Sequence, residues 1–246
     1  MARKLRRKSA AGYYHLILRG NNKQILFEAP DDYRFFLSRL GKYCRESEIR
    51  ISAYCLMENH VHLLVKDPQD TVPAMMQKLS LSYSFYYNRK YGQTGHLFQG
   101  RYLSEPVENE FYLLTVFRYI LNNPRKAGIC PAADYRWSSY RGYFRPSAAL
   151  DLDFIREQYP TAEAYREYIS QDNEDECLEY TQSLHDDAWA REILLNSLKV
   201  SSGTELQAWE KEKRNNAVLF LKKKGLSLRQ IERLTGISRG IVQRAG

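Results

Sequence analysis

Long apolar runs are missing from this sequence of 246 residues. A membrane-spanning helix needs roughly 18 consecutive apolar residues, and no stretch approaches that length. The basic N-terminus MARKLRRKSAAGYY is not followed by the apolar segment that a secretory signal requires. We therefore expect a cytoplasmic protein that neither crosses a membrane nor is secreted.

Cysteine is also scarce. The four cysteines, Cys44, Cys55, Cys130 and Cys177, are widely separated. They lack the close pairs of a zinc ribbon and the density of a disulfide-stabilised domain, so we expect reduced thiols without a chemical role. The remaining composition, with 43% hydrophobic and 27% charged residues, is that of a globular protein and excludes disorder over the whole chain.

Charge is distributed unevenly along the chain. Residues 1–150 carry 23 basic and 12 acidic side chains, a net charge of +11. Residues 151–198 carry 3 basic and 13 acidic side chains, a net charge of −10, and residues 199–246 carry 11 and 4, a net charge of +7. Two basic blocks on either side of an acidic one favour a polyanionic partner such as a nucleic acid.

The alternation of apolar and turn residues predicts a mixed fold for the first part of the chain. Strands are expected at residues 13–19, 49–56, 60–65 and 101–107, and helices at about 30–44, 71–91 and 108–123. Pro124 is expected to end the last of these helices. The order β-α-β-β-α-β-α indicates an α+β, ferredoxin-like domain, in which helices pack against an antiparallel sheet.

We expect three regions in the chain. Residues 1–147 form the ferredoxin-like domain with its basic N-terminal arm, residues 148–204 an acidic helical connector, and residues 205–246 an all-α module. The boundaries follow the change in charge and the change from mixed to purely helical patterns.

The all-α module has the signals of a helix-turn-helix. Gly225 ends one helix, Ser227 and Ser238 are placed to cap the two that follow, and Gly236 marks the turn between them. A helical hairpin without a ligand would have the same apolar pattern, but the local net charge of +7 favours DNA binding. The side chains expected to face outward and contact DNA are Gln230, Arg239, Gln243 and Arg244.

His60 and His62 are candidate metal ligands. They lie two residues apart on a predicted strand, so both side chains project from one face while Val61 points to the other. A lone histidine is usually a satisfied core residue, but two in register suit a divalent metal. No further ligand is spaced to complete a tetrahedral zinc site, so Mg²⁺ or Mn²⁺, with positions open for phosphate and water, fits better.

The predicted helix over residues 108–123 carries two further candidates. Tyr119 and Asn123 are four residues apart and therefore share a helical face. A tyrosine beside a metal can attack phosphorus, and an asparagine carbonyl is a neutral ligand for Mg²⁺ or Mn²⁺. Helical periodicity alone would make Tyr119 a core aromatic residue, so both interpretations stay open at this point.

Five short motifs follow one another between residues 10 and 145: YHLILRGNN, YCLMENHVHLLV, GHLFQGRY, FRYILNNPRKAGI and WSSY. Together they resemble the single-tyrosine HUH transposases, and most closely the REP-associated tyrosine transposases. The resemblance implies that His60 and His62 hold the metal, that Asn123 completes its site, and that Tyr119 is the nucleophile. It also implies the nicking and rejoining of single-stranded DNA through a 5′-phosphotyrosyl enzyme and a free 3′-OH.

Other polar residues are weaker candidates for DNA binding. In the loop GHLFQGRY, His96, Gln99 and Arg101 are placed to contact phosphate or orient a strand, although a loop that only caps the sheet would look the same. The role of His15 stays open. The N-terminal arm contributes five further candidates for DNA binding, Arg3, Lys4, Arg6, Arg7 and Lys8. The alternative is that this arm is a solubilising tail.

Taken together, these features predict a DNA transposase that depends on Mg²⁺ or Mn²⁺. Its catalytic domain would act on single-stranded or hairpin-bearing DNA and its C-terminal module would bind duplex DNA, in a monomer or a homodimer. The alternative is a non-catalytic, domesticated DNA-binding or regulatory protein. An unrelated metal enzyme with two histidines on a strand would need downstream histidine or carboxylate ligands that are not found here.

Overall fold

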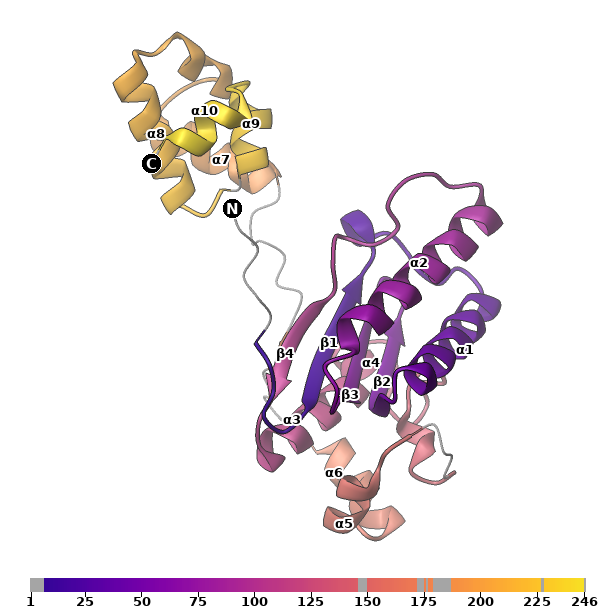
Figure 1. The fold of residues 1–246 in the computed structure, drawn as a ribbon. Coiled ribbons are helices and arrows are strands. Elements are labelled where there is room, and N and C mark those ends of the chain that lie inside the picture. The colour runs from indigo at the N-terminus through magenta and orange to yellow at the C-terminus, as the bar shows by residue number, and fades with distance from the viewer. Residues whose placement is uncertain are drawn as a thin grey trace. The chain divides into compact units, whose positions relative to one another are not determined.

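The computed structural model describes residues 7–145, 150–171, 175, 177–178, 187–226 and 228–245. The chain forms two compact units, which divide between Tyr180 and Thr181 (Figure 1). None of the described helices is both long enough and apolar enough to cross a membrane.

A four-stranded antiparallel sheet lies at the centre of the N-terminal unit, in the order β2-β3-β1-β4 (Figure 1). The strands are β1 (Tyr13–Arg19), β2 (Arg50–Met57), β3 (His60–Lys66) and β4 (Leu103–Val107). The two residues Glu58 and Asn59 connect β2 to β3. This order confirms the predicted ferredoxin-like, α+β fold, and it places β1 and β3 in the middle of the sheet.

Two long helices, α1 (Pro30–Glu46) and α2 (Val72–Tyr91), cover one face of the sheet (Figure 1). They pack on side chains that β1 and β3 direct to this face, which are Leu16, Leu18, Val61, Leu63 and Val65. Side chains alternate between the two faces of a sheet. Val61 therefore lies in the core below α1 and α2, and its neighbours in the chain point to the opposite face.

The helix α3 (Glu110–Leu121) covers that opposite face and lies behind the sheet in Figure 1. Asn109 caps its first turn, because its side-chain oxygen accepts a hydrogen bond from the Tyr112 N–H at 2.8 Å. Its buried apolar residues include Leu113, Val116, Phe117 and Ile120. The described part of the N-terminal unit thus has a hydrophobic core on each side of the sheet.

The end of α3 differs from the prediction of one helix over residues 108–123. The helix ends at Leu121, and a short helix, α4 (Asn123–Lys126), follows after Asn122. Pro124 does not stop the chain from being helical, because it lies in the first turn of α4, where a helix does not need the missing N–H.

The motif WSSY covers the outer edge of β2. The Leu56 N–H donates to the Trp137 carbonyl at 2.9 Å, and the Tyr54 N–H donates to Ser139 Oγ at 2.9 Å. The Trp137 ring also stacks on Tyr33 of α1, with 4.2 Å between ring centres. An unprotected edge strand is prone to pair with other chains, so this motif protects the sheet.

The acidic residues 148–204 do not form a separate connector. The helices α5 (Asp153–Gln158) and α6 (Ala162–Ser170) pack into the N-terminal unit, whereas α7 (Asp187–Leu198) packs into the C-terminal one. The residues that α5, α6 and their flanks bury include Leu152, Ile155, Tyr165 and Ile169. The units therefore divide near residue 180, because these apolar side chains outweigh the net charge of the stretch.

The C-terminal unit is all-helical. After α7 come the 3₁₀ helix η3 (Gly203–Ala208), α8 (Lys211–Lys223), α9 (Leu228–Thr235) and α10 (Arg239–Arg244). Gly236, between α9 and α10, has a φ of +68°, a left-handed conformation that favours glycine. Ile231, Ile237 and Val242 are buried in the shared core. The expected cap Ser227 lies outside the described residues.

Candidate active site

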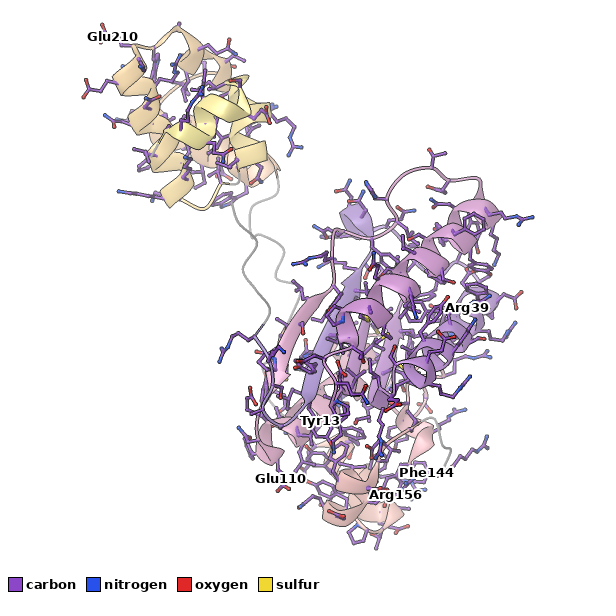
Figure 2. The ribbon with its side chains drawn as sticks, viewed as in Figure 1. Tyr13, Arg39, Glu110, Phe144, Arg156 and Glu210 are labelled. Atoms are coloured by element: carbon purple, nitrogen blue, oxygen red, sulfur yellow. The ribbon has the colours of Figure 1, made fainter. Side chains whose placement is uncertain are left out.

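Tyr119 and the two histidines meet on the α3 face of the sheet. Figure 2 labels Tyr13, where β1 begins, and Glu110, where α3 begins. The start of β1 pairs with the end of β4, so α3 sets out from that end of the sheet, and it packs on β3 and β2. The Tyr119 ring then lies 5.8 Å from the His62 ring, measured between ring centres.

A pocket of about 420 Å³ opens at this point. It is lined by Ile17, Arg19, Lys23, Met57, Asn59, His60, His62, Tyr119, Asn123, Lys126 and Ala127. The candidate nucleophile and the three candidate metal ligands are all among these residues. The strand β3, the helix α3 and the helix α4 each contribute to the group, so the site depends on the fold of the whole N-terminal unit.

The rings of His60 and His62 lie edge to face, with their centres 5.0 Å apart. The Nδ1 atom of His60 hydrogen-bonds the side-chain oxygen of Asn59 at 2.7 Å. The Nδ1 atom of His62 hydrogen-bonds Nε2 of His15 at 3.0 Å. Since each ring uses Nδ1 for a contact with the protein, Nε2 is the atom through which each would bind a metal.

His15 and His62 are neutral near pH 7. Both are buried, with exposed fractions of 0% and 3%. Burial lowers the pKa of His15 to about 3. Burial, together with the neighbouring His15 and His60, lowers the pKa of His62 well below its ordinary value. A neutral imidazole is the form that binds a metal, so His62 is in the form that a metal site needs.

Tyr119 and Asn123 stay together across the break between α3 and α4. Asn123 Nδ2 donates a hydrogen bond to the Tyr119 carbonyl at 3.0 Å. The amide nitrogen of Asn123 is thus used within the helix, and its carbonyl oxygen is the atom suited to a metal. Tyr119 is only 2% exposed, so it is part of the core and of the pocket lining at once.

Three cations that were not predicted as site residues also line the pocket. Arg19 ends β1, Lys23 lies in the turn that follows, and Lys126 has its Nζ atom 4.4 Å from the centre of the Tyr119 ring. None of the described lining residues is acidic, so the pocket suits phosphate groups. Lys126 follows Asn123 by about one helical turn, and this spacing is the signal that would have identified it.

The donor set fits a divalent metal with open coordination positions. Two imidazoles and one amide oxygen come from the chain. Among the described residues, no three or more histidine, cysteine, aspartate and glutamate side chains are grouped to hold a metal. They therefore do not form a closed zinc site, whereas Mg²⁺ or Mn²⁺ keeps positions for phosphate oxygens and water.

His96 and Arg101 do not line the pocket. Both are exposed and lie in the loop between α2 and β4. This loop runs beside the end of β1, where Phe98 pairs with Gly20 and the Gln99 N–H donates to the Arg19 carbonyl at 2.8 Å. The loop therefore borders the basic side of the pocket.

The described end of the N-terminal arm is exposed. Arg7 and Lys8 are open to solvent, and Lys8 forms an ion pair with Asp70. The other predicted arm residues, Arg3, Lys4 and Arg6, lie outside the described residues.

Gln230 does not face outward as predicted, since it is only 7% exposed. The helix α9 packs against α7, α8, α10 and η3, and Gln230 is buried among these elements, whereas Arg233 on the same helix is exposed. On α10, Gln243 and Arg244 are exposed. The helix begins at Arg239, whose side chain lies outside the described residues.

Residues 8–123 match the family model of IS200-like transposases. The matched segment contains both pocket histidines, Tyr119 and Asn123. The similarity to this family therefore extends over residues 8–123. No protein of curated function matches the chain.

The chain is also similar to solved structures. One is a REP-associated tyrosine transposase bound to a REP hairpin, with a TM-score of 0.51 and 17% identity, covering 62% of this chain and 96% of that one. Another, from Deinococcus radiodurans R1 and assigned as a transposase, has a TM-score of 0.35 and 21% identity, covering 49% of this chain and 96% of that one. The first shows that the four-stranded sheet with its helices has the HUH tyrosine transposase fold.

Proposed function

We propose that this IS200-like transposase domain cuts and rejoins single-stranded DNA through a covalent bond to Tyr119. The observation that carries the proposal is one pocket that contains Tyr119, two histidines, an asparagine and three cations. Both histidines are hydrogen-bonded, and His62 is neutral. None of the described residues that line the pocket is acidic. The similar REP-associated transposase is bound to a REP hairpin, which supports a hairpin-bearing strand as the substrate.

Tyr119 acts as the nucleophile. Its phenolic oxygen attacks the phosphorus of the scissile phosphodiester, and the bond between phosphorus and the 3′ oxygen breaks. The proton lost by the phenol balances the proton gained by the 3′ oxygen. The products are a 5′-phosphotyrosyl protein and a strand that ends in a free 3′-OH. Attack by another 3′-OH on the phosphotyrosine rejoins the DNA and releases Tyr119, so neither step needs ATP.

The other pocket residues hold the metal and the strand. His60, His62 and Asn123 would bind Mg²⁺ or Mn²⁺, which supplies a Lewis acid for the scissile phosphate when bound. The three pocket cations hold neighbouring phosphates of the strand through their charge. Most of the rate then comes from positioning and from stabilisation of charge at the phosphate.

Loss of a metal ligand is expected to slow cutting strongly. His60→Ala protein should cut a labelled hairpin-bearing strand more slowly by about 100-fold or more, because one of two imidazoles is gone. Added Mn²⁺ should not restore the full rate. EDTA should stop the wild-type protein, and a denaturing gel of the reaction measures all three effects.

The same gel separates the proposal from its alternative. Undiminished cutting in EDTA would remove the metal from the mechanism. Wild-type protein that binds the strand but never cuts it, with Mg²⁺ or with Mn²⁺, would favour a non-catalytic DNA-binding or regulatory protein.

We further propose that the C-terminal unit binds duplex DNA through α10. Its last 48 residues have a net charge of +7, and Gly236 makes a tight turn between α9 and α10. In a helix-turn-helix, the second helix lies in the major groove. The exposed Gln243 and Arg244 are then the side chains placed to contact it.

Arg244→Ala is expected to weaken duplex binding by the full-length protein by about tenfold, the equivalent of about 1.4 kcal/mol. Fluorescence anisotropy on a duplex that carries the DNA flanking the gene, at several salt concentrations, measures the effect. Lys211→Ala is the control, because it removes one exposed positive charge from α8. Equal losses for both variants would contradict a specific role for α10.

A further inference from the structure

His15 lies against His62 at the centre of the sheet. The strands β1 and β3 are neighbours, and the pairing of Ile17 with His62 places the two rings side by side on the α3 face. The rings stack, with 5.3 Å between centres and an angle of 28° between planes. Nε2 of His15 is 3.0 Å from Nδ1 of His62, and His15 is fully buried.

A hydrogen bond between two neutral imidazoles can run in either direction. If His15 Nε2–H donates to His62 Nδ1, the proton of His62 lies on Nε2, and this atom cannot bind a metal. If His62 Nδ1–H donates to His15 Nε2, the lone pair of His62 lies on Nε2. Only this second direction is compatible with His62 as a metal ligand.

The other ring nitrogen of His15 gives no reason for a histidine at this position. Its Nδ1 atom is buried and has no hydrogen-bond partner within the described part of the chain. A buried polar atom without a partner is unfavourable, so an apolar side chain of similar size would fill this space better. The hydrogen bond to His62 is what distinguishes His15 from such a residue.

We propose that His15 is a positioning residue of the metal site. It accepts a hydrogen bond from His62 Nδ1–H, and so fixes the tautomer and the ring orientation in which His62 Nε2 binds the metal. Asn59 makes the corresponding contact with His60. The proposal rests on the proposed function, because it requires a metal on His62.

Three substitutions at His15 separate the hydrogen bond from packing. In His15→Gln, the longer amide side chain reaches the place of His15 Nε2 and can present its oxygen to His62. In His15→Asn, the side chain ends near the place of Nδ1 and does not reach. We expect His15→Gln to keep the affinity for Mn²⁺, and His15→Asn and His15→Ala to lose about 10–100-fold.

Binding of Mn²⁺ alone to the full-length protein, measured by calorimetry or electron paramagnetic resonance, reads out this affinity without any cutting. At saturating Mn²⁺, the His15→Asn protein should recover most of its cutting rate, because affinity for the metal is lost rather than the nucleophile. In ¹⁵N NMR spectra of wild-type protein with Mg²⁺, His62 should be protonated at Nδ1 and not at Nε2.

Wild-type Mn²⁺ affinity in His15→Asn and His15→Ala would overturn the proposal, as would His62 protonated at Nε2 in the Mg²⁺-bound protein. If these two variants do not fold, the His15→Gln variant and the NMR spectrum decide. A 10–100-fold loss of Mn²⁺ affinity in His15→Gln then counts against the proposal. Failure of the proposed function looks different: His60→Ala and His62→Ala would then also bind Mn²⁺ like the wild type, or the wild type would bind none.

Discussion

Tyr119→Phe protein should bind a hairpin-bearing single strand as tightly as the wild type, yet cut it at least about four orders of magnitude more slowly. The substitution removes one oxygen atom, which is the proposed nucleophile. It keeps the ring that packs against His62 and lies beside Lys126, so folding and binding should change little. The protein–DNA adduct that survives SDS should disappear, because its covalent bond is made through that oxygen.

Tyr112→Phe is the matched control for this experiment. Tyr112 lies on the same helix, two turns before Tyr119, and its hydroxyl donates to Glu105 Oε2 at 2.7 Å. It does not line the pocket, so this variant should cut the strand and form the adduct. A gel in SDS with labelled DNA reads both variants at once, and an adduct that persists in Tyr119→Phe would assign the nucleophile to another residue.

Local periodicity was enough to predict the main elements of the N-terminal unit. The alternation along residues 13–19 and 60–65 fixes which side chains share a face, so it correctly separated Val61 from His60 and His62. These signals depend only on neighbours in the chain. The fold class followed from the order of elements, because few topologies fit the order β-α-β-β-α-β-α.

The errors arose where long-range packing decides the structure. Charge and helical patterning indicated a separate connector at residues 148–204, but Ile155 and Tyr165 reach a core formed by distant strands and α3. Gln230 was expected on the surface because its own helix is amphipathic, yet neighbouring helices cover it. Neither outcome can be read from the residues next to these positions.

The candidate site shows the same division. Strand spacing places His60 and His62 on one face of β3, and helical spacing places Tyr119 and Asn123 on one helical face. These two groups lie in one pocket only because α3 lies across β3. Tyr119 satisfied the pattern of a core aromatic and is indeed buried. Its motif, and not its periodicity, distinguished it from the other tyrosines.

The carboxylate of Asp32, in the first turn of α1, is fully buried and ties α1 to α2. It forms an ion pair with Lys90 of α2. Its hydrogen-bond donors are the N–H groups of Glu28 (2.9 Å) and Ala29 (2.8 Å) and the hydroxyls of Tyr86 (2.9 Å) and Tyr91 (2.7 Å). The network therefore caps one helix and joins it to the helix beside it.

Asp32→Ala is expected to lower the free energy of unfolding by about 3–5 kcal/mol, because several donors lose their acceptor at once. Lys90→Ala should cost less, since the Lys90 side chain is 32% exposed and Asp32 keeps its other hydrogen bonds. Urea denaturation of the full-length variants, followed by circular dichroism, measures both. A smaller loss for Asp32→Ala than for Lys90→Ala would contradict this assignment.

The same network predicts how stability depends on pH. Burial alone would raise the pKa of the Asp32 carboxyl, but hydrogen bonds from Lys90, Tyr91, the Ala29 N–H and Tyr86 outweigh it and hold the pKa below its ordinary value. Such a carboxyl stabilises the fold fully above its unfolded pKa of about 3.9, and this contribution is lost as pH falls through the folded pKa. Wild-type and Asp32→Ala proteins should therefore differ most in stability near neutral pH and converge in acid. A difference that stays constant down to the lowest pH at which both fold would mean that the charge of Asp32 adds nothing to its role as a cap.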